Sequence, residues 1–281
     1  MDLTTPIQTI EAESLNKVYF EENYIRQNKP VIIKGLLHCT EAEKLWSLEY
    51  LTEKLGRYPV RVFDKTKENG TSFLRGNRTV LMKEMLNLIH GNESSNLRMF
   101  VSKVLNKDKD LQTHFSTPAF FTCKLQLPKL LFLGGKGTIV PLHFDFLFDD
   151  GLLTQFFGRK EVILIENSQS KLLCRLPLNS ISLINLFEVN YEENPQLKKV
   201  KGYRVTLEHG DTLYIPSGYW HQLKYTDASM SVAFRKWNLN PVKSISTAIL
   251  RIGQITVDKS LNALFRKRWL RLKVKIARSR L

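Results

Sequence analysis

Short apolar runs follow one another along the chain from Phe120 onward and are separated by Gly and Pro turns. Runs of this length at even spacing predict the strands of a β-sandwich or barrel, here of the jelly-roll kind. The longer and more polar interval 167–202 predicts an insertion at the rim of the barrel. The expected strands cover residues 121–127, 130–133, 138–140 with a continuation over 141–146, 152–157, 161–166, 204–207, 212–215, 221–225 and 230–234.

The first 110 or so residues have a mixed pattern. Apolar residues at helical spacing predict helices at 12–19 and 80–89, and a helix in the region 44–51 that is capped by Ser47 and ends at Gly56. β-branched runs predict strands at 31–33 and 59–63, and the polar stretch 65–77 predicts a surface loop. The expected fold class is therefore mainly β with flanking helices.

The last forty residues form a helical pattern of a different kind. A first apolar series is interrupted at Gly253, and a second series over 261–276 would place a wide apolar stripe on a second helix. A stripe that wide must be covered by the barrel or by a second copy of the chain. The first series consists of Val242, Ile245, Ala248, Ile249 and Ile252, and the second of Leu261, Leu264, Phe265, Trp269, Leu272 and Ile276.

Charge is concentrated in the same segment. The chain of 281 residues has a net charge of +15, and residues 251–281 hold ten Lys or Arg against the single Asp258, which gives +9 for this tail. A charge run of this kind is usually a solvated helix face; the alternatives are contact with nucleic acid, an acidic partner or a membrane surface.

Composition indicates a folded protein without a membrane span. Apolar residues make up 43% of the chain, which is typical of globular proteins, and we find no run of about eighteen apolar residues. Residues 1–10 lack the basic start and apolar core of a signal peptide. The three scattered cysteines, Cys39, Cys123 and Cys174, are interpreted as thiols in a reducing compartment. We therefore expect a cytoplasmic protein.

Candidate metal ligands lie on two of the expected strands. Val140, Leu142, Phe144 and Phe146 alternate with polar residues, so His143 and Asp145 should share the opposite face. A second hairpin after Pro216 can bring His221 across the barrel to them. Two histidines and one carboxylate leave open positions on an octahedral ion and favour a non-haem Fe(II) oxygenase over zinc. The alternative is a structural barrel in which these polar residues occur by chance.

The remaining histidines give no such pattern. His38, His90, His114 and His209 all lie at the ends of elements or in loops, where an exposed or backbone-bonded histidine is common. We do not expect them to bind metal.

Several motifs in order resemble one known family. Residues 29–35 (KPVIIKG), 45–51 (LWSLEYL), 141–145 (PLHFD), 152–160 (LLTQFFGRK) and 213–221 (LYIPSGYWH) are similar to those of JmjC-type, cupin-like 2-oxoglutarate oxygenases. The subgroup with the strongest resemblance includes the asparaginyl hydroxylase that acts on hypoxia-inducible factor and its bacterial relatives. The resemblance extends from about residue 6 to residue 240 and implies a double-stranded β-helix (cupin) core at about 120–237, within an oxygenase domain of residues 1–240.

This resemblance implies roles for individual residues. His143, Asp145 and His221 would bind Fe(II), and Lys160, otherwise read as a turn residue, would pair with the distal carboxylate of the co-substrate 2-oxoglutarate. The chain departs from the family at Val140, Phe100, Gly151 and Ala233, where relatives have a threonine, a tyrosine and two asparagines. Nearby side chains that could replace the lost co-substrate contacts are Thr138, Ser102, Gln155 and Arg235.

The resemblance also implies an activity and an assembly. The expected enzyme is a dioxygenase that hydroxylates a C–H bond of a protein or peptide side chain. The alternatives are an oxygenase that acts on RNA, as the basic tail suggests, and a non-catalytic metal-binding interaction module. In the similar hydroxylases the C-terminal helices form a dimer, so residues 241–281 are expected to make a homodimer. Specificity would lie in the insertion and the N-terminal elements, and the sequence does not identify the substrate.

Overall fold

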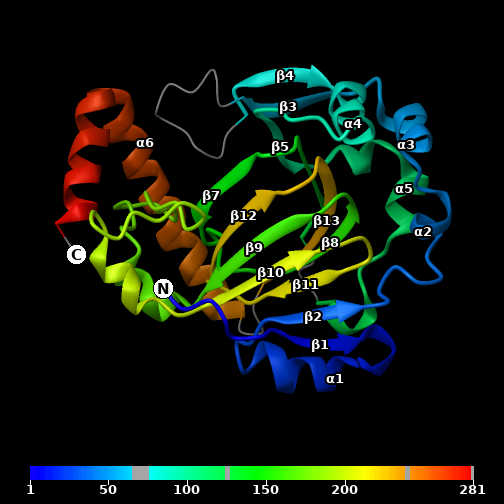
Figure 1. Ribbon diagram of the computed structural model, residues 1–281, viewed down its shortest axis with the longest axis horizontal. Coiled ribbons are helices and arrows are strands. Elements are labelled where there is room, and N and C mark those ends of the chain that lie inside the picture. Colours follow the sequence, from blue (N-terminus) through cyan, green and yellow to red (C-terminus); the bar gives the residue numbers. More distant parts are fainter. Residues whose placement is uncertain (65–75, 124–126, 238–240, 280–281) are drawn as a thin grey trace.

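The computed structural model describes residues 1–64, 76–123, 127–237 and 241–279. Its strands form two sheets that face each other (Figure 1). The strands are β1 (Gln8–Glu11), β2 (Val31–Lys34), β3 (Pro59–Asp64), β4 (Arg78–Leu81), β5 (Leu97–Ser102), β6 (Leu130–Gly134), β7 (Ile139–His143), β8 (Asp150–Phe157), β9 (Lys160–Ile165), β10 (Tyr203–Leu207), β11 (Thr212–Ile215), β12 (Trp220–Tyr225) and β13 (Ser229–Lys236).

The eight strands from β6 to β13 form the barrel. Strands β11, β8, β13 and β6 lie side by side in the large sheet, and β10, β9, β12 and β7 make the small sheet. All pairs among them are antiparallel. Alternate side chains of both sheets point inward and form one apolar cluster that includes Leu153, Leu213 and Leu223. This is the sandwich that the strand pattern predicts, with the cupin-like core that the resemblance implies.

The N-terminal half extends the large sheet on both edges. Strand β2 pairs with β11 and carries β1, while β5, β3 and β4 continue the sheet beyond β6. Helices pack on the outer face over a separate apolar core. Ser47 accepts a hydrogen bond from the Tyr50 amide and caps α3, and Gly56 ends it, as the sequence predicts. The helices are α1 (Lys17–Phe20), α2 (Glu41–Leu45), α3 (Leu48–Leu55), α4 (Met82–His90), α5 (Lys109–His114) and α6 (Pro241–Arg278).

Several predicted elements differ in the structure. The strand expected at 121–127 is instead a 3₁₀ turn at Ala119–Phe121, where Phe120 packs on Phe20 with ring centroids 4.9 Å apart; residues 124–126 lie outside the described part. The helix expected at 12–19 is divided into a 3₁₀ turn, the short α1 and a π turn. The helix expected from residue 80 starts at Met82, because Val80 belongs to β4 and pairs with Val60 of β3. Aromatic packing at Phe120 and strand pairing at Val80 override local spacing.

The insertion between β9 and β10 lies on the outside of the small sheet. Its apolar residues pack against Leu142, Phe144 and Trp220. Its backbone also pairs with β7: the Ser182 amide donates to the Leu142 carbonyl, and the Phe144 amide donates to the Ser180 carbonyl. The insertion therefore supports the strand that carries His143.

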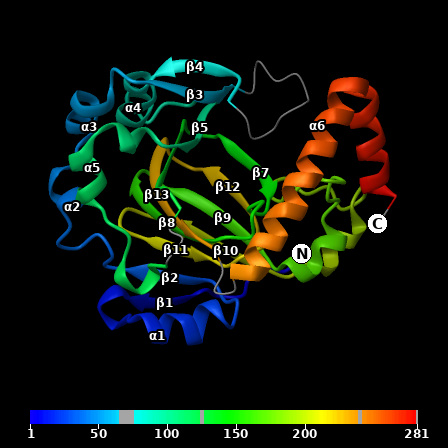
Figure 2. The same ribbon diagram turned by 180° about the vertical axis from the view of Figure 1, so that it is seen from behind.

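The C-terminal helix breaks at a different place from the one predicted. Gly253 lies inside a continuous helix, whereas Arg266 has a non-helical backbone with φ 41° and ψ −117°. The chain reverses there, so α6 is a helical hairpin beside the barrel (Figures 1 and 2). Asp258 Oδ1 accepts hydrogen bonds of 2.8 Å from Trp269 Nε1 and from Lys273 Nζ, which tie the two arms together.

The break divides the predicted apolar stripe. Leu264 and Phe265 lie before the reversal and are 73% and 52% exposed, while Leu272 on the second arm is also exposed. The helical register is lost at Arg266, so these residues no longer share one buried face. The side chains of Val242, Ile245 and Ala248 lie outside the described residues. No helix in the described ranges has the length and apolar character needed to span a bilayer.

Candidate metal centre

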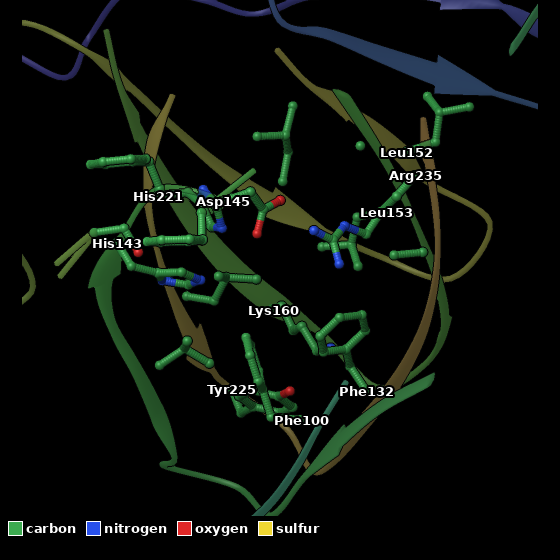
Figure 3. Close-up of a pocket in the computed structure, with 18 residues that line it drawn as sticks. Phe100, Phe132, His143, Asp145, Leu152, Leu153, Lys160, His221, Tyr225 and Arg235 are labelled. Atoms are coloured by element: carbon green, nitrogen blue, oxygen red, sulfur yellow. The ribbon is translucent and has the colours of Figure 1, made fainter. Parts of the chain in front are cut away.

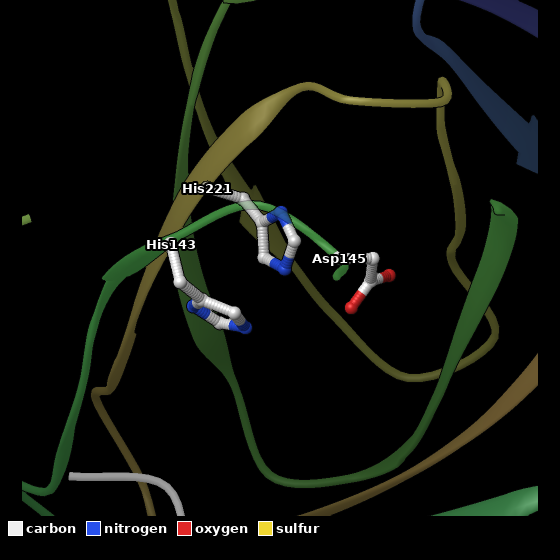
Figure 4. A group of neighbouring side chains, drawn as sticks. All are labelled: His143, Asp145 and His221. Atoms are coloured by element: carbon white, nitrogen blue, oxygen red, sulfur yellow. The ribbon is translucent and has the colours of Figure 1, made fainter. Parts of the chain in front are cut away.

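Three side chains, from β7, the loop that follows it and β12, meet at one end of the barrel (Figure 4). His143 ends β7, Asp145 follows two residues later, and His221 lies on β12 directly opposite His143. One potential ligand atom from each of the three lies within 4.8 Å of the others. The two imidazole centroids are 4.2 Å apart. The predicted triad is therefore brought together by the fold.

The backbone fixes the orientation of both imidazoles. Nδ1 of His143 lies 2.8 Å from the Pro141 carbonyl oxygen, and Nδ1 of His221 lies 3.0 Å from the Tyr219 carbonyl oxygen. A carbonyl only accepts, so each Nδ1 carries the proton and each Nε2 presents a lone pair. This second hydrogen bond is typical of metal-binding histidines.

The charges of the triad also suit a cation. Burial, with help from the neighbouring His221, lowers the pKa of His143 to about 3, so the imidazole is neutral. Burial raises the pKa of the Asp145 carboxyl, but nearby positive charge, above all the Arg235 guanidinium, outweighs it and holds that pKa below its usual range. Two imidazoles and one carboxylate are the donor set of the facial triad that binds non-haem Fe(II).

A bulge in β7 corrects one sequence prediction. His221 on β12 pairs with His143 on β7, and Leu223 pairs with Val140. Two residues separate His143 from Val140 on β7, whereas one residue separates His221 from Leu223 on β12. The extra residue turns Val140 to the same side as His143 instead of the opposite side. Leu142 remains on the outer face under the insertion, and Phe144 packs there while it also lines the cavity. Strict alternation fails here because the partner strand determines the pairing.

The loop after β7 is held firmly against the turn before β12. Ser217 Oγ donates to the Phe148 carbonyl oxygen, and Asp150 accepts hydrogen bonds from Tyr214 Oη at 2.7 Å and from the Ser217 amide at 3.1 Å. From the other side, the Arg251 guanidinium of α6 lies 4.9 Å from the ring centroid of Phe148. These contacts fix the loop that presents Asp145.

The triad opens into a cavity of about 240 Å³ inside the barrel (Figure 3). Most of its wall is apolar, and its polar side chains come from both sheets. Val140, Phe100, Gly151 and Ala233, the four positions at which the resemblance predicts a departure from the family, all line it. The other lining residues are Phe132, His143, Phe144, Asp145, Phe146, Leu152, Leu153, Lys160, Ser180, Ile215, His221, Leu223, Tyr225 and Arg235.

Lys160 is a cation inside this cavity. It starts β9, is fully buried, and donates a hydrogen bond of 2.6 Å to Ser231 Oγ. Within the described ranges no carboxylate forms an ion pair with it. Burial lowers the pKa of the Lys160 ammonium to about 7. A buried ammonium without a counterion is unfavourable until an anion enters the cavity.

The other predicted co-substrate residues are placed less favourably. Arg235 lines the cavity, and its Nε donates to Asp149 Oδ2. Three others lie outside the lining. Thr138 Oγ1 donates to the Ser95 and Gly135 carbonyls, Ser102 Oγ accepts from the Val104 amide, and Gln155 donates to the Phe157 and Gly158 carbonyls. Gln155 Oε1 also accepts from Ser231 Oγ, so this glutamine supports the partner of Lys160 from behind.

The structure also shows lining residues that sequence reasoning missed. His221, Leu223 and Tyr225 are alternate residues of β12, and all three line the cavity. Because alternate residues of a strand share one face, counting from His221 in steps of two along the expected strand would have predicted that Tyr225 faces the cavity. The four remaining histidines take no part in a metal cluster among the described residues. His209, for example, bonds the Phe156 carbonyl through Nδ1, as expected for a backbone-bonded histidine.

Comparisons with known proteins agree with this architecture. Residues 17–241 match the family model described as "Cupin-like domain". The chain is 25% identical to Jumonji C domain-containing protein 5 of Drosophila melanogaster over 244 residues, which cover 81% of this chain and 59% of that protein. It is 26% identical to lysine-specific demethylase JMJ30 of Arabidopsis thaliana over 240 residues, which cover 81% of this chain and 54% of that protein. The chain thus spans little more than half the length of these two relatives.

A third relative has a different kind of substrate in its name. The human tRNA wybutosine-synthesizing protein 5 is 23% identical over 235 residues, which cover 75% of this chain and 72% of that protein. The names of the similar proteins therefore point to both protein and tRNA substrates.

Proposed function

The chain belongs to the cupin-like domain family, and we propose that it is an Fe(II)- and 2-oxoglutarate-dependent dioxygenase that hydroxylates a C–H bond. One observation carries this proposal: the His143, Asp145 and His221 triad opens into the same cavity as the buried Lys160, which has no carboxylate partner among the described residues. A metal site and an anion site in one cavity match a co-substrate that is both a chelator and a dicarboxylate.

The residues present fit both groups. The triad would hold the iron and leave adjacent coordination positions open, and Lys160 would hold the distal carboxylate of 2-oxoglutarate. Bound iron supplies the oxidising chemistry with dioxygen while 2-oxoglutarate is converted to succinate and carbon dioxide. The protein positions the reactants, and the apolar wall that includes Phe100, Phe132 and Leu153 excludes water.

We propose a protein or peptide side chain as the substrate. The cavity of about 240 Å³ is smaller than a typical small-molecule site, so beside the co-substrate it has room for one reacting side chain rather than a large free metabolite. Ser180 of the insertion reaches the cavity wall, which supports a role of the insertion in specificity. We also propose that the protein acts in the cytoplasm and that it belongs to the asparaginyl hydroxylase subgroup that its motifs resemble.

An RNA substrate is the second candidate because of the C-terminal hairpin. Its exposed basic residues, among them Arg266, Lys267, Arg268 and Arg271, would meet phosphates, and one similar protein is named for tRNA. Binding of tRNA that weakens steeply with salt and is lost when Arg266, Lys267 and Arg268 become glutamine would favour this candidate over a peptide.

Turnover of the co-substrate tests the proposed activity. Purified protein with Fe(II), ascorbate and 2-oxoglutarate is expected to form succinate, since the triad and Lys160 would hold the metal and the co-substrate in one cavity. The control is the same protein with an excess of metal chelator. Succinate no higher than in the chelated control, despite tight Fe(II) binding, would instead support a non-catalytic metal-binding module.

Dimer formation through the α6 hairpin is a second expected result. Leu264 and Phe265 at its tip are largely exposed, and burying them against a second copy would remove apolar surface from water. The double substitution Leu264→Glu and Phe265→Glu should reduce the mass in light scattering from twice to once the chain mass of 32.6 kDa. The matched control is Val18→Glu, an apolar residue 70% exposed on α1. An unchanged dimer in the double variant, or a wild-type monomer, would contradict this proposal.

A further inference from the structure

The hydroxyl of Tyr225 is a polar group without a partner. Tyr225 is only 2% exposed and lines the cavity, and its hydroxyl makes no hydrogen bond within the described ranges. The oxygen is not among the enclosed unpaired atoms of the described residues, so the hydroxyl opens onto the cavity. It can therefore donate a hydrogen bond to a polar group that enters the cavity from outside.

Tyr225 and Lys160 form a pair across two neighbouring strands. They are directly opposite in the antiparallel pairing of β12 with β9, which puts their side chains on the same face. The Lys160 ammonium lies 4.3 Å from the centroid of the Tyr225 ring. Figure 3 shows both residues at the end of the cavity away from the triad. One small anion can reach both groups there.

The fold makes room for the tyrosine ring at this place. A Cβ atom on Gly134 of β6 would lie 2.8 Å from Cε1 of Tyr225, so a larger residue would displace the ring. Phe100 and Phe132, which Figure 3 shows at this end, are apolar. Lys160 and Tyr225 are thus the polar groups available to an anion there.

We propose that Tyr225 binds the co-substrate together with Lys160: the hydroxyl donates a hydrogen bond to one oxygen of the distal carboxylate of 2-oxoglutarate, and the ammonium pairs with that carboxylate. This inference rests on the proposed function. It assigns to β12 the hydroxyl contact that Val140 and Phe100 cannot make. Burial raises the pKa of Tyr225, so the phenol stays protonated and remains a donor at neutral pH.

Removing only the hydroxyl tests the assignment. The substitution Tyr225→Phe is expected to weaken 2-oxoglutarate binding roughly tenfold to a hundredfold, the range for a hydrogen bond to a charged group. Binding is measured by calorimetry on protein loaded with Mn(II), which avoids turnover. Pyruvate, a 2-oxo acid without the distal carboxylate, should bind both proteins equally within about twofold, and Mn(II) affinity should not change.

Two controls separate binding from structure. Tyr203→Phe changes a tyrosine of the same small sheet that does not line the cavity, and it should leave 2-oxoglutarate binding unchanged. The melting temperature of ligand-free Tyr225→Phe should equal or exceed that of the wild type, because the hydroxyl has no protein partner to lose.

The outcomes distinguish this inference from the proposal beneath it. Wild-type affinity for 2-oxoglutarate in Tyr225→Phe, or an equal loss for 2-oxoglutarate and pyruvate, would overturn the assignment and leave the proposed function standing. Failure of the wild-type protein to bind 2-oxoglutarate would instead overturn the proposed function. As a second variant, Gly134→Ala should also weaken 2-oxoglutarate more than pyruvate, because it displaces the ring; equal effects on both would count against the assignment.

Discussion

Replacing Asp145 by alanine is expected to weaken Fe(II) binding roughly a hundredfold or more and to reduce succinate formation to the level of the chelated protein. Asp145 is the anionic member of the triad, and its loss leaves only two imidazoles to hold a divalent cation. Even indirect supports of metal ligands are typically worth tenfold to a hundredfold in affinity, so the loss of a ligand should exceed that range. Metal titration by calorimetry and a succinate assay measure the two effects.

The matched control is Asp110→Ala. Asp110 is an exposed carboxylate on α5 that pairs with Lys54 at 3.7 Å and is remote from the cavity. It should change neither metal affinity nor turnover. Circular dichroism of Asp145→Ala should match that of the wild type. If correctly folded Asp145→Ala bound Fe(II) as tightly as the wild type, the triad would not be the metal centre.

The second large effect is expected from Lys160→Met, with opposite signs for binding and stability. Loss of the ammonium should weaken 2-oxoglutarate binding roughly a hundredfold or more, as for one partner of a buried charge pair. The ligand-free protein should become more stable, because an apolar side chain of similar length replaces a buried cation without a carboxylate partner. Calorimetry and thermal unfolding measure the two effects.

The pH dependence of stability gives a further measure of the Lys160 prediction. The pKa of Lys160 is about 7 in the folded protein, against about 10.4 in an unfolded chain. Between these values the unfolded chain binds more protons, so this lysine makes stability rise with pH over that window. The Lys160→Met variant should lack this part of the rise.

Ligand binding should show the complementary effect. A bound carboxylate favours the charged form of Lys160. At pH 8 to 9 the Lys160 amine should therefore take up a proton when 2-oxoglutarate binds, and the affinity for 2-oxoglutarate should fall as the pH rises above about 7. Calorimetry in buffers of different ionisation enthalpy detects this uptake. Lys224→Met is the control, since Lys224 is on the same strand β12 but does not line the cavity. A loss of stability in Lys160→Met together with unchanged ligand affinity would contradict the proposed role.

Much of the candidate site could be predicted because its signals are local. The His143 and Asp145 pair and the hairpin that carries His221 each lie within a few residues, where side-chain direction follows from the strand or turn itself. The capping of α3 by Ser47 is equally local. These features were correct because a short segment contains all the information they need.

The far end of the cavity could not be predicted in the same way. Thr138, Ser102 and Gln155 were expected near the site, but their polar atoms have other partners. Thr138 bonds backbone carbonyls, Ser102 bonds a backbone amide, and Gln155 bonds backbone carbonyls and Ser231. Tyr225 gave no motif signal and reaches Lys160 only through the pairing of β12 with β9. A residue's own spacing does not show which strand will lie beside it.

The sequence alone determined the strand-rich class of the fold, the identity of the three candidate ligands and the presence of a basic helical tail, because period, turn residues and charge are properties of single segments. Only the tertiary structure decided that Val140 faces the cavity, that α6 reverses at Arg266 rather than at Gly253, and that Lys160 lies buried beside Tyr225. Each of these depends on contacts between segments far apart in the chain, whose energies local patterns do not contain.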